Sequence, residues 1–417
     1  MDGVIGVIVM KKKYNILAIA YAFEPHKGSE PEVGWKTILE LGKNNRVFVI
    51  TRQNNKINIE NEVKNNKKIF ENIEIIYYDL PKIFILIKKY IKFNQIYYFI
   101  WQIAIARKIK SICKKYSIDV CHHITFATIK VFSAGAFSGV PFIFGPVGGA
   151  ERTNYKFYKN ITKRCILKET IRDIVIKISK YNPLNLYTLK RADKILVTTS
   201  ETNNFVPKKY RNKCEIMQTI AVDNIVYRKS KEFNGVLNLL YVGNLLHWKG
   251  TNIIVDTLNS LNKLDVNFKM HIIGDGEQKS FMKAQLKKYK IDDKVEFLGK
   301  LPRINVLEKY EQSDLLFFPS LHDSGGMVVL EAMSKGTPTI CLNNGGPAVN
   351  IKNNVNGIIV EGTSYDEVIK NLAFEIKILS EDREKLKRLS EACLVNLNQY
   401  TWKNKINKII NIYNNIN

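Results

Sequence analysis

Two acidic residues, Asp323 and Glu331, lie eight positions apart around the pair Gly325 and Gly326. Glycines free the backbone to turn sharply, so a strand that ends before them can pass into a helix that opens near Met327. The unpaired N–H groups and the positive dipole at such a helix start suit a phosphate. Glu331 falls in the apolar part of that helix, where a carboxylate needs donors such as the hydroxyls of a ribose. The spacing therefore indicates sugar-nucleotide chemistry.

The same two acids also fit a less specific interpretation. Glu331 is then a solvated position on an amphipathic helix, and Asp323 is a loop or N-cap residue. The spacing alone does not separate the two interpretations, so residues at neighbouring strand ends bear on the choice.

Glycines and a lysine follow other expected strands of the second half. Residues 243–250 form a loop in which Lys249 stands one step before Gly250 and can reach a phosphate as a point charge. Gly274 and Gly276 offer a further loop of close approach after the next strand. Glycine-containing turns are common in α/β proteins, but together with the paired acids these residues predict one convergent site.

Apolar runs typical of strands alternate with helical segments through both halves of the chain. Helices are expected near residues 31–41 and 251–261. The expected strands are residues 14–21, 46–51, 73–78, 119–122, 141–145, 237–243, 270–274, 295–299, 315–319, 338–342 and 357–360. This alternation predicts an α/β fold of two doubly wound, Rossmann-like domains, in which ligands bind beyond the carboxyl ends of the strands. The polar stretch 214–233 separates the two halves.

Composition is that of a globular protein with an ample core. The chain has 417 residues, which suits two domains, with 45% hydrophobic and 25% charged residues. The six cysteines are scattered without CxxC or Cys/His spacing, so neither a zinc site nor a disulfide framework is expected, and a cytoplasmic location follows. Residues 3–10 are apolar but too short to span a bilayer. Met1 and Met10 are alternative starts of translation.

Positive charge is concentrated in the first half. The net charge is +25, and residues 1–210 carry 36 basic against 16 acidic residues, whereas residues 211–417 carry 28 against 23. Residues 82–116 mix lysines with aromatic and aliphatic residues. Such a helix suits either the anionic surface of a membrane, as a peripheral protein, or a core-facing position with a basic solvated back. No nucleic-acid recognition motif accompanies the charge, so nucleic acid is not an expected partner.

Three motifs of the second half resemble those of a known enzyme family. Residues 241–250 resemble its phosphate-binding loop, residues 297–300 the loop that holds the nucleotide base, and residues 323–331 its paired acid motif. The chain thus resembles, over nearly all of its length, the retaining GT-B glycosyltransferases of family 4 (group 1), which include bacterial cell-surface polysaccharide enzymes. In that family the first acid is usually glutamate, whereas here it is the shorter Asp323, and Asn244 stands where many members have arginine. Lys249, with Arg303 or another basic residue, would then carry more of the phosphate charge.

Two loops of the first half resemble a subset of the same family. They are residues 24–35 and 145–151, and each follows an expected strand. The family commonly has a histidine near the donor sugar at the end of the strand that begins at Asp119, which matches either His122 or His123. The resemblance implies acceptor-side roles for Glu30, Gly148, Gly149 and Glu151.

The resemblance also implies a domain plan and a set of site residues. Residues 1–215 would bind the acceptor, residues 216–398 the nucleotide sugar, and residues 399–417 would form a helix that crosses back to the first domain, with the two domains facing across a cleft. The implied catalytic residues are His122, His123, Lys249 and Asp323. The implied donor-binding residues are Gly28, Ser29, Gly243, Asn244, Lys249, Gly274, Gly276, Leu298, Ser324, Gly325, Gly326, Met327 and Glu331.

The activity implied is transfer of a sugar from a nucleotide diphosphate sugar to a saccharide or lipid-linked acceptor, with retention at the anomeric carbon. No acidic cluster with metal-ligand spacing is visible in the sequence, so a lysine and the helix dipole are expected to stabilise the leaving phosphate, without a cofactor. A sugar-nucleotide epimerase of similar fold and a non-catalytic nucleotide-sugar or nucleic-acid binding protein are the alternatives. The base, the sugar and the acceptor depend on pocket shape, which the sequence does not give.

Overall fold

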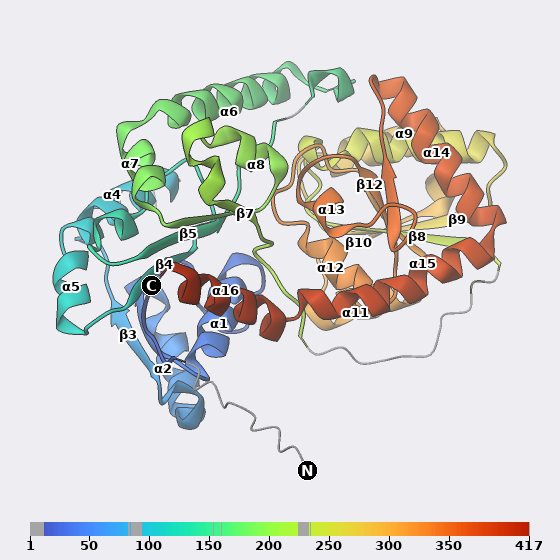
Figure 1. Cartoon of the computed structure of the whole chain (residues 1–417). Helices are drawn as coiled ribbons and strands as arrows, with labels where there is room; N and C mark the ends of the chain where they lie inside the picture. Colours follow the sequence, from blue (N-terminus) through green and yellow to red (C-terminus); the bar gives the residue numbers. More distant parts are fainter. Residues whose placement is uncertain are drawn as a thin grey trace, which may run out of the picture.

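Two parallel β-sheets, each packed with helices, form two domains joined side by side (Figure 1). The computed structural model describes residues 12–81, 84, 94–152, 154–159, 161–223, 233 and 235–416. Each sheet buries apolar side chains on both of its faces, as parallel sheets do. The expected α/β architecture of two Rossmann-like domains is confirmed.

The first sheet has seven parallel strands in the order β3-β2-β1-β4-β5-β6-β7. The strands are β1 (Asn15–Ala20), β2 (Arg46–Thr51), β3 (Ile73–Tyr77), β4 (Val120–Thr125), β5 (Phe142–Val147), β6 (Lys194–Val197) and β7 (Cys214–Ile216). The helices of this domain are α1 (Ser29–Gly42), α2 (Lys56–Asn65), α4 (Asn94–Ala106), α5 (Ile109–Lys115), α6 (Lys163–Tyr181), α7 (Pro183–Arg191) and α8 (Ser200–Phe205).

The second sheet has six parallel strands in the order β10-β9-β8-β11-β12-β13. The strands are β8 (Leu237–Val242), β9 (Phe268–Ile273), β10 (Val295–Gly299), β11 (Leu315–Phe318), β12 (Thr339–Leu342) and β13 (Gly357–Val360). The helices are α9 (Thr251–Lys263), α10 (Lys279–Lys288), α11 (Arg303–Gln312), α12 (Met327–Met333), α13 (Gly345–Asn350), α14 (Tyr365–Glu381) and α15 (Arg383–Asn396).

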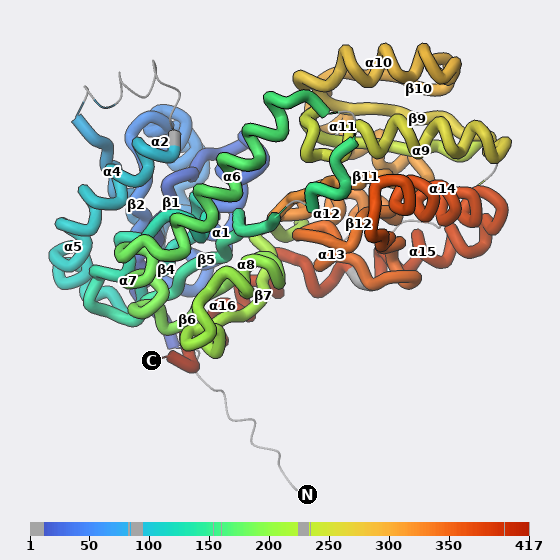
Figure 2. The backbone as a smooth tube through the Cα atoms, turned by 90° about the horizontal axis from the view of Figure 1, so that it is seen from above, coloured from blue at the N-terminus to red at the C-terminus, as the bar shows by residue number. Residues whose placement is uncertain are grey.

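The chain passes between the domains twice, and the two passages lie against each other. Val222 N–H donates to Tyr400 O at 2.9 Å, and Trp402 N–H donates to Val222 O at 3.1 Å. The last helix, α16 (Trp402–Ile416), then packs on α1 of the first domain (Figures 1 and 2). Its apolar face, which includes Ile409 and Tyr413, is part of the first domain's core. The expected helix that crosses back is therefore present.

Every strand expected from the sequence is present, whereas β6 and β7 are additional. They are short strands at one edge of the first sheet, and β7 pairs with β6 through Glu215 and Ile216. Ile216 therefore belongs to the first sheet, one residue beyond the expected boundary at 215. Residues 3–10 and most of 82–93 lie outside the described residues. Among the helices that are described, none is both long and apolar enough to cross a membrane.

Candidate functional site

A cavity of about 440 Å³ lies between the domains, at the carboxyl ends of strands from both sheets. Its first-domain wall comes from the start of α1, the end of β4 and the residue after β6. Its second-domain wall comes from the ends of β8 and β11 and from the loop before α12. The lining residues are Ser29, Glu30, Val33, Ile124, Ala127, Thr198, Thr219, Val242, Gly243, Asn244, Lys249, Phe318, Asp323, Ser324, Gly325, Met327 and Val328. The position is where parallel α/β sheets bind ligands.

Lys249 and Asp323 form an ion pair on the second-domain wall of this cavity. Each side chain is only 18% exposed. Burial raises the pKa of the Asp323 carboxyl, but the ammonium of Lys249 and two backbone N–H groups outweigh burial, so its pKa lies below the usual range. Asp323 is therefore ionised and holds the lysine at the cavity wall. A diphosphate that enters would compete with Asp323 for Lys249.

The second oxygen of Asp323 is bonded to the turn that opens α12. Asp323 Oδ1 accepts from Gly325 N–H at 2.9 Å and from Gly326 N–H at 3.0 Å. In this structure the aspartate occupies these two N–H groups, and their expected role in phosphate binding stays a prediction. The loop or N-cap interpretation of Asp323 is right about these bonds. Its pairing with Lys249 at the cavity goes beyond that interpretation.

Glu30 stands at the N-terminal end of α1, on the first-domain wall of the cavity. Its Oε1 accepts from Ala127 N–H at 2.5 Å. Burial raises the pKa of the Glu30 carboxyl above its ordinary value, although the backbone N–H groups of Phe126 and Ala127 oppose the rise. Glu30 therefore faces the ligand space, as expected.

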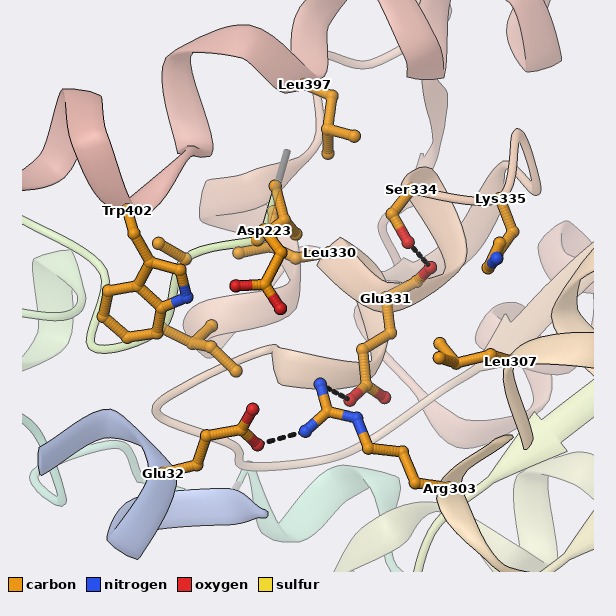
Figure 3. A pocket seen from close by; sticks show the side chains of 13 residues that line it. Glu32, Asp223, Arg303, Leu307, Leu330, Glu331, Ser334, Lys335, Leu397 and Trp402 are labelled. Atoms are coloured by element: carbon orange, nitrogen blue, oxygen red, sulfur yellow. Dashed lines mark hydrogen bonds and ion pairs between the residues drawn. The ribbon is translucent and has the colours of Figure 1, made fainter. Parts of the chain in front are cut away.

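Glu331 lies in a second, smaller cavity of about 180 Å³ beside the crossing segments. Figure 3 shows Arg303 of α11 between Glu331 and Glu32 of α1, with Trp402 on the opposite wall. Arg303 pairs with Glu32 and lies 3.5 Å from Glu331 Oε1, and the hydroxyl of Tyr310 donates to Glu331 Oε2 at 3.3 Å. Burial raises the pKa of Glu331 despite these partners.

The partners of Glu331 settle which interpretation of its position is right. Its carboxylate is not solvated on a helix surface, because its side chain is only 16% exposed. Arg303 was one of the basic residues named as a candidate to carry phosphate charge, but here its guanidinium joins two carboxylates from different domains. Glu32 is a site residue that the sequence did not indicate, since its partner lies 271 positions away.

Both candidate catalytic histidines are fully buried, and neither lines the cavity. His122 Nε2–H donates to Gly145 O, which can only accept, so Nδ1 accepts from the hydroxyl of Tyr413 on α16, and both distances are 2.7 Å. His122 thus joins β4 to the C-terminal helix, and its expected catalytic role stays a prediction. His123 Nδ1 lies 2.9 Å from Ser133 Oγ, and Nε2 lies 3.4 Å from Phe126 O. This second histidine supports the loop that carries Ala127.

Several expected donor-binding residues do not line the cavity. A Cβ on Gly274 would lie 1.9 Å from Gly243 O, and one on Gly276 would lie 2.4 Å from Leu245 O. These glycines allow two strand-end loops to pack backbone against backbone, which explains their residue type. Leu298 packs against the core of the second domain. Gly28, which has a φ of 66°, precedes α1 and is also outside the cavity lining.

The expected acceptor-side loop contacts the other domain instead of open space. Gly149 N–H donates to Ser324 Oγ at 3.0 Å, and a Cβ on Gly148 would lie 2.6 Å from that serine's Cβ. Glu151 is buried and accepts from Ser324 at 2.6 Å and from Thr199 at 2.9 Å. The role of Gly148, Gly149 and Glu151 in this state is to hold the two domains together beside the cavity.

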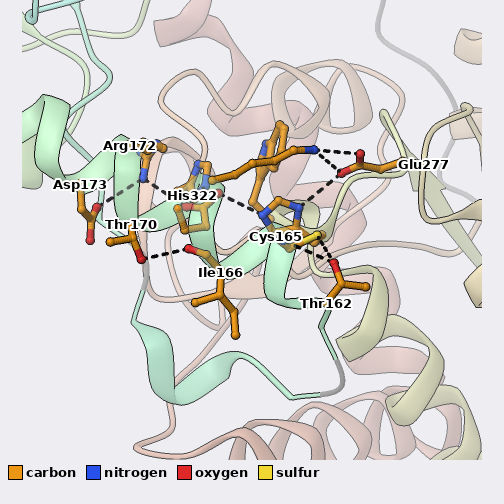
Figure 4. A network of polar contacts seen from close by, with 12 residues as sticks. Thr162, Cys165, Ile166, Thr170, Arg172, Asp173, Glu277 and His322 are labelled. Carbon is orange, nitrogen blue, oxygen red and sulfur yellow. Dashed lines mark hydrogen bonds and ion pairs between the residues drawn. The ribbon is translucent and has the colours of Figure 1, made fainter.

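Helix α6 joins the domains through Glu169, a residue that the sequence did not indicate. Glu169 Oε1 lies 3.1 Å from His247 Nε2, and Oε2 lies 3.2 Å from His322 Nε2. Figure 4 shows the polar network to which His322 belongs, beside Arg172 and Asp173 of α6. Burial alone would raise the pKa of Glu169. The two histidines and Arg172 lower this pKa by more than burial raises it, so the net shift is downward. His247 is two residues before Lys249 and His322 directly precedes Asp323, so Glu169 holds both loops that carry the ion pair.

One group among the described residues has the composition of a metal site. Ligand atoms of Cys165, His247 and Glu277 lie within 4.8 Å of one another. The Glu277 carboxylate is already paired with Lys168 at 3.0 Å, and Cys165 Sγ accepts from the hydroxyl of Thr162 at 3.3 Å. His247 in turn lies 3.1 Å from Glu169, so the protein's own groups already engage all three side chains.

Comparison with known sequences relates the second domain to one family. Residues 224–395 match the family described as glycosyl transferases, group 1. An uncharacterized glycosyltransferase of Haemophilus influenzae is 29% identical over 183 residues, which are 43% of this chain and 50% of that protein. The D-inositol 3-phosphate glycosyltransferase of Corynebacterium glutamicum is 23% identical over 180 residues, 42% of each chain. The chain thus spans half or less of these relatives' length.

Solved structures match nearly the whole chain. A glycosyltransferase from Rickettsia africae has a TM-score of 0.63 at 18% identity, covering 97% of this chain and 98% of that one. HepE of Anabaena, solved in complex with UDP, has a TM-score of 0.61 at 13% identity, covering 96% and 100%. At these identities the likeness concerns the fold, and the GT-B arrangement is confirmed.

Proposed function

We propose that this chain, which has the GT-B fold and whose residues 224–395 match the glycosyl transferases of group 1, transfers a sugar from a nucleotide diphosphate sugar. The acceptor is a saccharide or a lipid-linked saccharide, the product belongs to cell-surface polysaccharide, and the anomeric configuration is retained. The enzyme works in the cytoplasm, at the inner face of the membrane. The resemblance of residues 241–250 and 323–331 to family 4 motifs supports the polysaccharide product and the retained configuration.

The observation that carries the proposal is the ion pair of Lys249 and Asp323 at a cavity between the domains. Lys249 offers a positive charge that a diphosphate can take over from Asp323, and about 440 Å³ is enough volume for a sugar phosphate. Nucleotide sugar is also the ligand class of a structural neighbour, since HepE of Anabaena was solved with UDP-glucose.

The residues divide the work along the donor. Glu331 binds the ribose hydroxyls in the smaller cavity, where Arg303 now holds its carboxylate. Lys249 binds the diphosphate and stabilises the charge that develops on it as the glycosidic bond breaks. Asp323, released from the lysine, contacts the donor sugar. In this proposal the leaving phosphate, as in the resembled family, helps to deprotonate the acceptor.

A turnover screen tests the proposed activity. The protein is incubated with UDP-, GDP- and ADP-sugars, and release of the nucleoside diphosphate is measured. One donor should be hydrolysed slowly without acceptor, and Lys249→Ala should reduce the rate about 100-fold, since a transition-state charge loses its partner. Lys279→Ala, which removes a surface pair with Asp275 in the same domain, is the matched control and should leave the rate unchanged.

Two outcomes contradict the proposal. Conversion of a nucleotide sugar to its epimer without release of nucleoside diphosphate would identify a sugar-nucleotide epimerase. Salt-sensitive binding of DNA, with no binding of any nucleotide sugar, would identify a nucleic-acid binding protein.

A further inference from the structure

Helix α6 (Lys163–Tyr181) has an inner face that packs on the protein and an outer face that does not. Its inner face carries the buried residues Cys165, Glu169, Ile176 and Ser179. Its outer face exposes large apolar side chains by between 42% and 74% of their surface. They are Ile166, Leu167, Ile171, Ile174, Val175, Ile178 and Tyr181. The helix lies along the top edge of the first domain in Figure 1 and across the near face of the molecule in Figure 2.

The exposed apolar side chains form a continuous strip. Leu167, Ile171, Ile174, Ile178 and Tyr181 follow one another at alternating spacings of four and three residues, which places them on one line of a helix. At a rise of about 1.5 Å per residue the strip is about 21 Å long. Soluble proteins seldom leave such an apolar surface uncovered without an interaction that uses it.

The charged residues of α6 are sorted between the two faces. The outer face and its margins carry Lys163, Arg164 and Lys177, which are exposed. The two acidic residues turn inward: the Glu169 side chain is 4% exposed and the Asp173 side chain is 17% exposed. The outer face is therefore apolar along its middle and positive at its margins.

We propose that the outer face of α6 docks on an anionic phospholipid bilayer, with the apolar strip in the headgroup region and the basic residues against lipid phosphates. This inference rests on the proposed function and deepens it, because it names the surface that reaches the membrane. A helix with an apolar face and basic margins binds anionic membranes in this way. A second copy of the chain fits less well, since the basic margins of two such faces would repel each other.

The alternative membrane surface, residues 82–116, is less suitable over its described part. Helix α4 buries Tyr97, Tyr98, Trp101 and Ile105 in the first domain's core. The core-facing interpretation of that segment is therefore right for α4, and these four side chains are not available to a bilayer. Helix α6 differs because its apolar outer face has no such core to join.

Docking through α6 would bring the interdomain cavity to the membrane surface. The inner face of the same helix holds the loops of Lys249 and Asp323 through Glu169, His247 and His322. A lipid-linked acceptor that stays in the bilayer could then meet the donor without leaving the membrane.

Vesicle flotation of the full chain tests the proposal. Wild type should float with vesicles of phosphatidylcholine and phosphatidylglycerol and should not float with phosphatidylcholine alone. Ile171→Ser/Ile178→Ser should reduce the bound fraction at least tenfold. Phe374→Ser/Val395→Ser, which changes two equally exposed side chains of the second domain, is the matched control and should bind as wild type does. Lys163→Gln/Arg164→Gln/Lys177→Gln should weaken binding and its dependence on salt.

The result that overturns the proposal is the same bound fraction for wild type and Ile171→Ser/Ile178→Ser, or no flotation of wild type. A wild-type dimer in sedimentation that the same double variant dissociates, without vesicle binding, would assign the face to a second copy and also overturn it. Donor hydrolysis in vesicle-free buffer is measured on each protein. It should be equal in all of them, so loss of membrane binding is distinguishable from failure of the proposed activity.

Discussion

Asp323 and Lys249 neutralise each other at the cavity wall. Because of this pairing, we expect Asp323→Asn to have different effects on diphosphate binding and on turnover. Asp323→Asn removes the charge that holds Lys249 while keeping a side chain that can accept a backbone N–H bond. The freed lysine should bind a nucleoside diphosphate at least as tightly as in wild type. Transfer should fall about 100-fold, since the carboxylate no longer contacts the donor sugar.

Titration calorimetry with the nucleoside diphosphate, combined with turnover of the matching donor, measures both effects of Asp323→Asn. Weaker diphosphate binding in Asp323→Asn than in wild type would contradict the view that Asp323 and phosphate compete for Lys249. Asp275→Asn, which loses the surface pair with Lys279, is the matched control.

The buried histidines of β4 predict a loss of stability in mild acid. Burial lowers the pKa of His122 to about 3 and that of His123 to about 4. In the unfolded chain a histidine titrates near pH 6.5, so below that pH the unfolded state binds protons that the folded state does not. The free energy of unfolding should therefore fall as the pH drops from about 6.5 towards 4.

Urea unfolding at pH 7 and pH 5 measures this dependence in wild type and in His122→Gln. The variant lacks one of the two titrating groups, so its loss of stability between the two pH values should be smaller. An equal loss in both proteins would show that His122 is not held neutral by the fold.

Helix α6 links the first domain to the two loops of the ion pair through its Glu169. Glu169→Gln removes the charge that His247 and His322 face, and the loops should lose alignment. The donor KM should then rise about tenfold, since the loss of one hydrogen bond to a charged group costs about 1.4 kcal/mol of binding free energy. Asp173→Asn, four residues along the same helix and paired with Arg172, should leave KM unchanged.

The pKa of Glu169 gives a second readout of the same contact. Since this pKa is lowered in the folded state, the carboxylate contributes stability above the unfolded value of about 4.3. That contribution disappears as the pH falls through the folded value. Glu169→Gln should show a smaller acid dependence than wild type below pH 4.5, and an unchanged acid dependence together with an unchanged KM would contradict the proposed role.

The turn before α12 is the second element on which the site depends. Gly326 has a φ of 57°, and a Cβ there would lie 2.7 Å from Asn350 Nδ2 and 2.8 Å from the backbone of Gly346. Gly326→Ala should therefore destabilise the protein by about 2 to 4 kcal/mol, through left-handed strain together with overpacking. Gly299→Ala measures the left-handed strain without the overpacking, because Gly299 has a φ of 68° and nothing within 4 Å of its Cβ position. A similar loss of stability in both variants, measured by urea unfolding, would show that crowding at Gly326 has no effect.

At the scale of the whole molecule, local pattern predicted the strands and the order of the domains. Buried parallel strands are continuous apolar runs, and the glycines at 325 and 326 marked the passage from β11 to α12. The meeting of Lys249 with Asp323 was also predictable, because both follow strands whose carboxyl ends share one edge of a sheet.

Contacts between the domains could not be predicted in the same way. Arg303 pairs with Glu32 across 271 positions, and Glu169 meets His322 across 153, separations that carry no sequence periodicity. The contact of His122 with α16 could not be predicted for a related reason: successive strand residues face opposite sides, and the helix on its side, α16, comes from the far end of the chain. The outer face of α6 required knowledge of which residues the fold leaves exposed.

Donor affinity tests the proposed donor site most directly. Titration calorimetry measures the affinity of the donor that the turnover screen identifies for wild type, Lys249→Ala, Glu331→Gln and the double variant. Each single change should weaken binding about tenfold, or about 1.4 kcal/mol. The losses should add in the double variant, because the two residues line separate cavities. Glu296→Gln, an exposed carboxylate of β10, should bind as wild type does. Wild-type affinity in both single variants would contradict the proposed donor site.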